Sequence, residues 1–491
     1  MGWWLVGLAL VLPWVIGTLW IRVAWRDVLS AGGWPLALGY GYLLGMLTVT
    51  LFLRLQAVAG FSADFGVPLV ALTVLGGAGV WWLWRRGAMT GNSTCSGPFR
   101  GQQPSWQRVV FVLLLSWLLW RLTGLALEIW WRPLYPWDAW ANWTVRSKVW
   151  AELRQWAPFV TPQQWLADPA PVVYTVEAWA YPVTVSLLAS WPALAFGGWQ
   201  ETIANLPWLG TALALALGFY GQVRLWGATP LVALLFTWLL LSLPILDTHI
   251  ALAGYADLWM ATAFSLAAIA FFQWVRTADR RQGILALLLA LACPLIKLEG
   301  TVWLAMFIPA LLVVWLRGWP LRVFAGIGIA LAVAWWSLGG VAFDVPRLGH
   351  FVIRPDLIQV PYLGRFALGY HPGTWGSVWK NFFVLANWHL FWYLVLISLV
   401  FAVLKARGAR WRRVMAVFIG SCALMLFVLF FCTDAQHWAA QYTSINRVFM
   451  HFVPELLFWV FTVWIPVRSV EKLPDPAPTV SYSSAGEHLT V

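Results

Sequence analysis

Residues 254–300 read GYADLWMATAFSLAAIAFFQWVRTADRRQGILALLLALACPLIKLEG and contain two apolar runs, 258–275 and 283–299. Each run approaches the roughly 20 residues with which an α-helix crosses a bilayer core of about 30 Å. Three arginines separate the runs, while Asp257 precedes the first and Lys297 lies at the end of the second. The segment therefore predicts two membrane-spanning helices, with a basic loop on one side and ionisable residues on the other.

The whole chain of 491 residues repeats this pattern. Hydrophobic residues make up 61% and charged residues 10%, against about 25% charged residues in a typical soluble domain. This composition excludes a soluble globular protein and a disordered one. Because no basic segment precedes the first apolar run, we expect a retained helix there rather than a cleaved signal. The candidate spans are the fourteen runs 3–24, 34–54, 67–84, 109–127, 182–198, 205–222, 228–246, 258–275, 283–299, 301–316, 323–342, 386–404, 414–432 and 448–467.

The basic residues determine how these runs cross the membrane. The net charge is +12, and the basic residues form short clusters between apolar runs. The positive-inside rule explains this better than a nucleic-acid partner, which we do not expect. If all fourteen runs cross and loop 85–108 is cytoplasmic, the dense cluster from Lys405 to Arg413 falls outside. If 182–198 only lies on or dips into the outer face, every later cluster becomes cytoplasmic. We therefore predict 13 transmembrane helices, although Arg54 remains at an outer end against the rule.

The predicted fold is all-α and polytopic, with amphipathic surface helices in the first large outer loop, 128–204. The second large outer loop, 343–385, carries charges of both signs and is expected to be a polar lid. We divide the chain into four parts: N-terminal accessory spans with a basic cytoplasmic loop (1–108), a core (109–345), an outer loop with C-terminal spans (346–470) and a disordered cytoplasmic tail (471–491).

The first outer loop opens with WWRPLYPWDAWANWTVRSKVWAEL, residues 130–153. A proline before the predicted helix makes Asp138 well placed as its N-cap, and Asn142 and Arg146 share its face at i+4 spacing. Tryptophans on the opposite side are expected to lean toward lipid. Asp138 either caps this surface helix or is a general base whose pKa is tuned by burial and neighbouring cations. Arg146 and Lys148 are candidates for those cations, or for binding a lipid phosphate.

Further candidates lie at the outer ends of later spans. Lys297 and Glu299 adjoin hydrocarbon with almost no connecting loop, so they are functional, or they neutralise each other or snorkel outward. Arg447 breaks the positive-inside trend and needs an anionic partner, which is either a phosphate or Asp434. The other pocket candidates are Tyr255, Asp257, His437 and Asn446.

Several motifs are missing from the sequence. It has no GxxxxGK[ST] phosphate loop, no HExxH motif and no Asp-x-Asp pair, and its four cysteines form no CxxC. ATP-driven pumping is therefore not supported, and we expect no metal ligands and no cofactor. A divalent metal ion is compatible with the sequence but not indicated by it.

The order of these features resembles the GT-C superfamily of polytopic glycosyltransferases, near the protein O-mannosyltransferase and aminoarabinose-transferase-like group. The likeness covers roughly residues 110–345 and rests on the aspartate of the first outer loop, the surface-lying segment, GYADL and KLEG. A weaker likeness extends to TSINR, residues 443–447. The chain departs from the common pattern in having three spans before the one that precedes Asp138, and in having Ala139 where a second acidic residue is usual.

The resemblance implies a membrane enzyme that transfers a sugar from a polyprenyl-phosphate donor to a lipid, glycan or protein acceptor. The reaction would take place at the extracytoplasmic face of the plasma (inner) membrane, among membrane lipids, with Asp138 as catalytic base. The candidates for binding the donor phosphate are Arg146, Lys148, Lys297 and Arg447.

Two other functions remain open. A transporter or flippase of a lipid-linked glycan would also need many spans, but with ionisable residues near the bilayer midplane. A polymerase or ligase of lipid-linked glycans would suit the charged loop 343–385. For the enzyme we predict that Asp138, Asp257, Lys297 and Arg447 converge on one outward-facing cavity, with Asp138 within about 4–6 Å of a cation.

Overall fold

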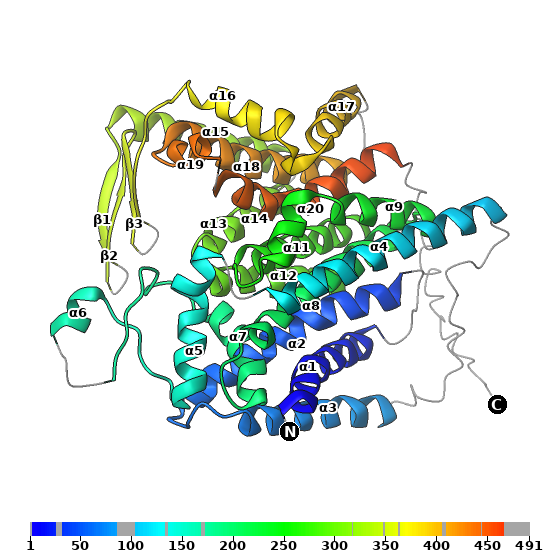
Figure 1. Ribbon diagram of the computed structural model, residues 1–491. Coiled ribbons are helices and arrows are strands. Elements are labelled where there is room, and N and C mark those ends of the chain that lie inside the picture. The colour runs from blue at the N-terminus through cyan, green and yellow to red at the C-terminus, as the bar shows by residue number, and fades with distance from the viewer. Residues whose placement is uncertain are drawn as a thin grey trace, which may run out of the picture.

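The fold is known from a computed structural model, in which the apolar runs form a helical bundle (Figure 1). The description covers residues 2–25, 32–85, 104–132, 136–167, 172–316, 318–346, 349–361, 364–404, 409–442 and 444–465. The tail 471–491, predicted to be disordered, and residues 405–408 of the basic cluster lie outside these ranges. All fourteen apolar runs are helical over most of their length, so the sequence located the helices of the bundle correctly.

Nine helices of the described residues are long and apolar enough to cross a membrane, which makes the chain a multi-pass membrane protein. A tenth span results if α9 (Pro230–Leu241) and α10 (Pro244–Ala251), bent by 68°, count as one. The predicted number of 13 is not reached on length and composition, and it stays a prediction. The nine helices are α1 (Gly2–Ala24), α2 (Gly33–Val58), α3 (Gly66–Arg85), α4 (Ser105–Trp131), α8 (Glu201–Leu225), α11 (Asp257–Thr277), α15 (Trp319–Ser337), α18 (Arg410–Cys432) and α20 (Ser444–Trp464).

Shorter helices complete the bundle and its ends. They are η1 (Ala139–Trp143), α5 (Thr144–Leu153), α6 (Pro162–Ala167), α7 (Thr184–Phe196), α12 (Arg280–Ile296), α13 (Gly300–Ala305), α14 (Phe307–Trp315), α16 (Thr374–Trp379), η2 (Lys380–Val384), η3 (Ala386–Trp388), α17 (Phe391–Leu404) and α19 (Gln436–Ala440).

Helix α11 is the centre of the bundle. Every residue from Asp257 to Gln273 is buried, and α8, α12 and α20 pack around the helix. Small side chains, among them Ala263, Ser265 and Ala267, allow this close approach. Helix α15, in contrast, has no buried residue and stands at the periphery.

The N-terminal helices α1 and α2 are packed against each other through glycines. A Cβ atom at Gly17 would lie 1.9 Å from the backbone oxygen of Gly41, so only glycine permits this approach. The pair is also bonded to the rest of the bundle. The Tyr40 hydroxyl donates to the Leu266 carbonyl of α11 over 2.8 Å, and Trp191 Nε1 of α7 donates to the Ala9 carbonyl over 2.7 Å.

The segment after Asp138 is helical, as predicted, and Trp140 and Lys148 are exposed, but most of the side expected to lean toward lipid is buried. Trp143 and Trp150, expected to lean toward lipid, are buried, because this helix packs against α7. All but one of the 13 residues of α7 are buried as well. At about 1.5 Å per residue α7 is roughly 20 Å long, too short for a bilayer core of about 30 Å. Its length supports the prediction that 182–198 does not cross.

Most of the described chain is helical, as predicted, but the prediction of an all-α fold is wrong for part of the segment 343–385. There, β1 (Val341–Val345), β2 (Gly349–Ile353), β3 (Leu357–Val360) and β4 (Gly364–Ala367) form an antiparallel sheet in chain order. Strand β1 is apolar except for Asp344, and Phe343 stacks on Phe351 of β2 with ring centroids 5.4 Å apart. Asp344 and His350, whose charges suggested a polar loop, face each other across the same hairpin.

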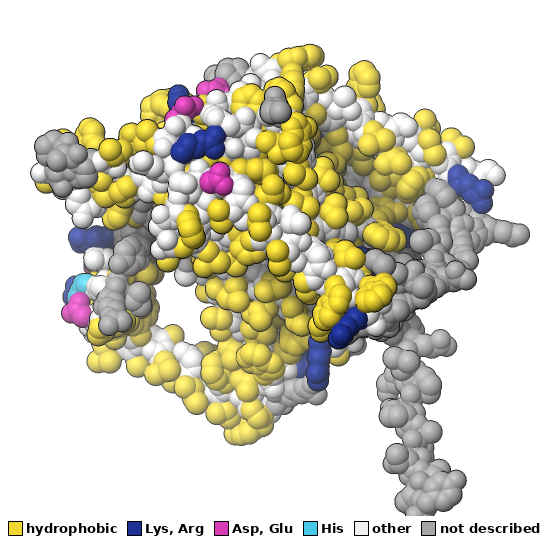
Figure 2. Space-filling view, turned by 90° about the horizontal axis from the view of Figure 1, so that it is seen from below, with side chains coloured by type: hydrophobic (Ala, Val, Ile, Leu, Met, Phe, Trp, Pro, Cys, Tyr) yellow, Lys and Arg dark blue, Asp and Glu magenta, His cyan; other side chains and the backbone are white. Residues whose placement is uncertain are grey.

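The surface matches a lipid environment. Figure 2 shows the molecule from below, where hydrophobic side chains dominate and charged ones are few. In Figure 1 most helices of the bundle run side to side, and α5, α6 and the sheet gather at one end. Many of the exposed side chains are large and apolar, including those of Trp84, Trp117, Trp120 and Trp131.

Candidate functional site

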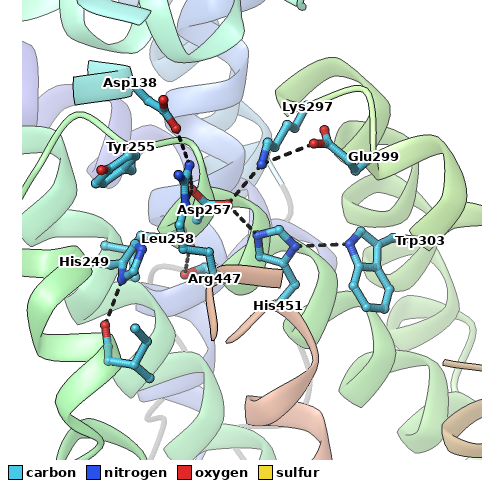
Figure 3. A network of polar contacts seen from close by, with 12 residues as sticks. Asp138, His249, Tyr255, Asp257, Leu258, Lys297, Glu299, Trp303, Arg447 and His451 are labelled. Atoms are coloured by element: carbon cyan, nitrogen blue, oxygen red, sulfur yellow. Dashed lines mark hydrogen bonds and ion pairs between the residues drawn. The ribbon is translucent and has the colours of Figure 1, made fainter. Parts of the chain in front are cut away.

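Four ionisable residues from four separate segments meet at one end of the bundle (Figure 3). Arg447 Nη2 lies 2.6 Å from Asp138 Oδ2 and 2.8 Å from Asp257 Oδ2. Lys297 Nζ lies 3.1 Å from Asp257 Oδ1. Asp138 comes from the helix start before η1, Asp257 begins α11, Lys297 directly follows α12, and Arg447 lies in the first turn of α20. The predicted proximity of these four residues is confirmed. We call the four residues and Glu299 together the acid–base cluster.

Asp257 is the hub of the acid–base cluster. Its side chain is fully buried and accepts four hydrogen bonds: two from Arg447, one from Lys297 Nζ and one from His451 Nε2. A buried carboxylate is stable only when its charge is paired and its oxygens are bonded in this way. The partners of Asp257 leave its carboxylate no accessible oxygen for chemistry, so it organises the cations.

His451 is held in one tautomer. Trp303 Nε1 donates to His451 Nδ1 over 3.1 Å, so this ring nitrogen is an acceptor. The other nitrogen, Nε2, therefore carries the proton that it donates to Asp257 over 3.0 Å. The imidazole is neutral in this arrangement and adds a hydrogen bond, but no charge, to the cluster.

Exposure increases across the acid–base cluster from the inside outward. The side chain of Asp257 is 0% exposed, that of Lys297 9% and that of Arg447 21%. Asp138 is 30% exposed and Glu299 40%. Asp138 and Glu299 are thus the two carboxylates that a molecule arriving from outside would meet.

Lys297 is bonded on both sides. Its Nζ lies 3.4 Å from Glu299 Oε1, and the Tyr181 hydroxyl donates to the same Glu299 oxygen over 3.2 Å. Burial alone would lower the pKa of Lys297, but the carboxylates of Asp257 and Glu299 more than offset this, so its pKa is raised. Lys297 and Glu299 do pair, as one interpretation held, but Lys297 also reaches Asp257.

Two of the other pocket candidates support Arg447. The Arg447 guanidinium carbon lies 4.3 Å from the centre of the half-buried Tyr255 ring, a cation–π contact. Asn446 is buried and does not reach the cluster. It accepts from Trp388 Nε1 over 2.9 Å and donates to Asn381 Oδ1 over 2.8 Å, which fixes the start of α20. Its role is to position Arg447.

Arg146 is not available to a phosphate, which corrects the prediction. It is fully buried, and its guanidinium donates to the backbone oxygens of Ala178, Trp179 and Tyr181 over 2.7 to 2.9 Å. Burial lowers the pKa of Arg146 to about 10, still well above neutrality. Arg146 thus holds in place the backbone from which Tyr181 reaches Glu299.

Lys148 and His437 are not brought to the cluster either. Both are exposed, and neither has an ion pair with another residue of the described ranges. The alternative roles of two candidates are also corrected. Asp138 directly precedes η1 but forms no side-chain capping bond, because its carboxylate is turned to Arg447. Arg447 pairs with Asp138 and Asp257 and not with the exposed Asp434.

Glu455 was not among the predicted site residues. It lies on α20 two turns beyond Arg447 and one turn beyond His451, fully buried near the middle of the helix. Ser265 Oγ of α11 lies 2.5 Å from Glu455 Oε2 and 3.0 Å from the His451 carbonyl oxygen, and Glu455 Oε1 has no partner among the described residues. A lone acidic residue within the run 448–467, at i+4 spacing from His451, was the available signal. Buried ionisable side chains are therefore found in the middle of a helix as well as at the end that carries the acid–base cluster.

Within the described ranges, no group of three or more His, Cys, Asp or Glu side chains could hold a metal ion. The chain was also compared with known protein families, curated proteins and solved structures. None of them matches. What the acid–base cluster does must therefore be inferred from its own geometry and chemistry.

Proposed function

We propose that the chain is a membrane glycosyltransferase that moves a sugar from a polyprenyl-phosphate donor to an acceptor hydroxyl. The observation that carries the proposal is the Asp138–Arg447 pair: a partly exposed carboxylate held 2.6 Å from a cation that is itself anchored on a buried carboxylate. Such a pair combines a base for the acceptor with a charge partner for the departing phosphate.

The charges of the acid–base cluster suggest how the site is switched on. Three carboxylates face two cations, so the cluster has a net charge of minus one and neither cation is free. A phosphate must displace a carboxylate to bind, and Asp138 is the more accessible of the two that Arg447 binds. Donor binding would thus release Asp138 from Arg447 at the moment when a free base is required.

The chemical step then balances without a cofactor. The acceptor oxygen forms a bond to the anomeric carbon, its proton passes to Asp138, and the bond from that carbon to the phosphate oxygen breaks. The leaving group is polyprenyl phosphate, whose charge Arg447 and Lys297 stabilise. The raised pKa of Lys297 keeps its ammonium group charged throughout. Displacement on the opposite face of the sugar inverts the anomeric configuration.

The basic residues suggest the side on which this happens. Arg276, Arg280 and Arg281 lie at the end of α11 and the start of α12, opposite the end that carries Asp257 and Lys297. By the positive-inside rule, the acid–base cluster then belongs to the extracytoplasmic face, and in a cell envelope this is the plasma (inner) membrane. The acceptor would be a lipid, a glycan or a protein presented there.

The test is a transfer assay on the purified protein in lipid nanodiscs with a panel of polyprenyl-phosphate sugars. Asp138→Asn removes the base, so turnover should fall by about 10²–10⁴-fold. The same change removes one negative charge from the cluster, so donor binding should persist or tighten. Asp434→Asn, at an exposed aspartate outside the cluster, is the matched control and should leave turnover unchanged. Full turnover in Asp138→Asn would exclude this mechanism.

One observation favours a second function, a transporter or flippase of a lipid-linked intermediate. Arg447, His451 and Glu455 follow one another at i+4 spacing along α20 and lead from the cluster to mid-helix depth, where coupling ions bind in transporters. Proteoliposomes with a labelled polyprenyl-phosphate sugar separate the two functions. Appearance of free polyprenyl phosphate supports the transferase, whereas movement of the intact donor between leaflets supports the transporter.

A further inference from the structure

A second arginine stands at the same end of the bundle, away from the acid–base cluster. Arg54 lies four residues before the end of α2, and its Nη2 donates to Thr184 Oγ1 over 2.7 Å. Thr184 in turn donates to the carbonyl oxygen of Leu295, near the end of α12. No carboxylate of the described residues lies within ion-pair distance of Arg54. A partly buried guanidinium whose hydrogen-bond partner is neutral would be stabilised by an anion.

Arg54 and Thr184 line one end of a groove between α1, α2 and α12, which has a volume of about 610 Å³. The rest of its lining is mainly apolar, with Leu44, Leu47 and Leu285 among the lining residues. Leu288, Leu291 and Leu295 along α12 also line it and are each about half exposed, so the groove opens sideways toward lipid. From Leu285 to Leu295 the helix rises by about 15 Å, the scale of an acyl chain segment.

The two ends of the groove differ in charge. At the other end Arg281 lies 3.2 Å from Asp279 and is neutralised there. Arg54 is the arginine of the groove lining that lacks such a partner in the described ranges. The headgroup of a lipid in the groove would therefore lie at Arg54, with its tail along the apolar wall. Charge-assisted hydrogen bonds from a guanidinium to a phosphate favour this orientation.

We propose that this groove is a specific site for one anionic membrane phospholipid, with its phosphate on Arg54 and an acyl chain between α1, α2 and α12. The site is connected to the acid–base cluster through short segments. Thr184 follows Tyr181, which bonds Glu299, by three residues, and Leu295 precedes Lys297 by two. The bound lipid therefore stabilises the turn from which Lys297 and Glu299 project. This inference does not depend on the proposed transferase activity.

Native mass spectrometry of the full chain, released from nanodiscs of mixed phosphatidylglycerol and phosphatidylcholine, tests the site. We expect the wild type to retain one phosphatidylglycerol molecule in preference to phosphatidylcholine. Arg54→Gln should lower this occupancy at least about tenfold, since hydrogen bonds to charged groups are worth that much or more. Arg54→Lys, which keeps the charge, should retain part of the preference.

The matched control is Arg280→Gln, which removes an exposed arginine near the start of α12 that does not line the groove, and it should leave occupancy unchanged. Equal retention of the two lipids, or an anionic preference that survives in Arg54→Gln, would overturn the proposal. So would displacement of phosphatidylglycerol by equimolar polyprenyl phosphate, because the groove would then belong to the donor. A melting curve of Arg54→Gln that matches the wild type in detergent shows that loss of lipid does not reflect misfolding.

Discussion

At the scale of single residues, Asp257 determines whether the acid–base cluster exists. Without its charge, Lys297 and Arg447 would face each other with only the partly exposed Asp138 and Glu299 to compensate. Asp257→Asn should therefore lower the free energy of unfolding by about 3–5 kcal/mol, the usual result of removing one partner of a buried ion pair. Thermal unfolding in detergent measures this. Asp138→Asn, at a partly exposed carboxylate, should cost less, and an equal loss in both variants would contradict the buried-hub interpretation.

The contribution of Lys297 to the stability of the fold is predicted to decrease at alkaline pH. Its pKa is higher in the folded protein than the roughly 10.4 of an unfolded lysine. The stabilisation is then fully present below about pH 10.4 and is lost as the pH rises through the pKa of the folded state. The difference in melting temperature between the wild type and Lys297→Met should be constant from neutral pH to about pH 10 and should narrow above it. Lys148→Met, at an exposed lysine, should show no such change.

At the scale of elements, the contacts of Glu455 on α20 predict that this side chain is protonated. The Ser265 hydroxyl has one hydrogen, yet it contacts two oxygens, those of Glu455 and of the His451 carbonyl. A carbonyl can only accept, so both contacts are satisfied together when Glu455 is the protonated acid and donates to Ser265. Glutamine donates in the same way. Glu455→Gln should thus change the free energy of unfolding by less than about 1 kcal/mol, while Glu455→Ala leaves a void and costs more. Equal destabilisation in the two variants would mean that a charged Glu455 is required.

Also at this scale, helices and strands differed in how well the sequence revealed them. The apolar runs are long, and their polar boundaries are clear, so all of them were located. The strands β1 to β4 are four or five residues long and carry Asp344, His350 and Arg365. In such short segments the alternation that marks a strand is obscured by charges that also fit a loop. The segment 182–198, which contains α7, was recognised as atypical because every later basic cluster becomes cytoplasmic if it does not cross, and this signal is independent of hydrophobicity.

At the scale of the whole molecule, the distribution of charge along the chain identified Arg447 correctly, whereas the local pattern that suggested Arg146 did not. Arg447 was identified because it breaks the positive-inside trend of the predicted topology, which depends on the whole chain, and the structure pairs it with Asp138 and Asp257. Arg146 was assigned from its position on one face of one helix. Its partners are backbone carbonyl oxygens within residues 178–181, more than 30 residues away in the sequence. A local sequence pattern does not predict a side-chain hydrogen bond to distant backbone.

The topology of the whole chain can be tested directly. If α7 does not cross the membrane, the basic loops that follow it lie in the cytoplasm. In a cysteine-free background, Gln164→Cys in α6 should label from outside, while Arg280→Cys and Arg412→Cys should label only from inside. All three positions are exposed. Labelling of Arg280→Cys and Arg412→Cys from the same side as Gln164→Cys would show that α7 crosses and that the 13-span topology is wrong.

The glycine contact between α1 and α2 has a consequence for biosynthesis. These helices leave the ribosome before α7, α8 and α11, and Gly17, Gly41 and Gly45 allow them to pair as a hairpin before those later helices have been made. The later helices then dock on a surface that already exists, through Trp191 on α7 and Leu266 on α11. A larger residue at Gly17 would therefore act during insertion. Its effect would appear as rapid degradation of newly made chains, while the molecules that escaped the quality-control proteases would have ordinary turnover.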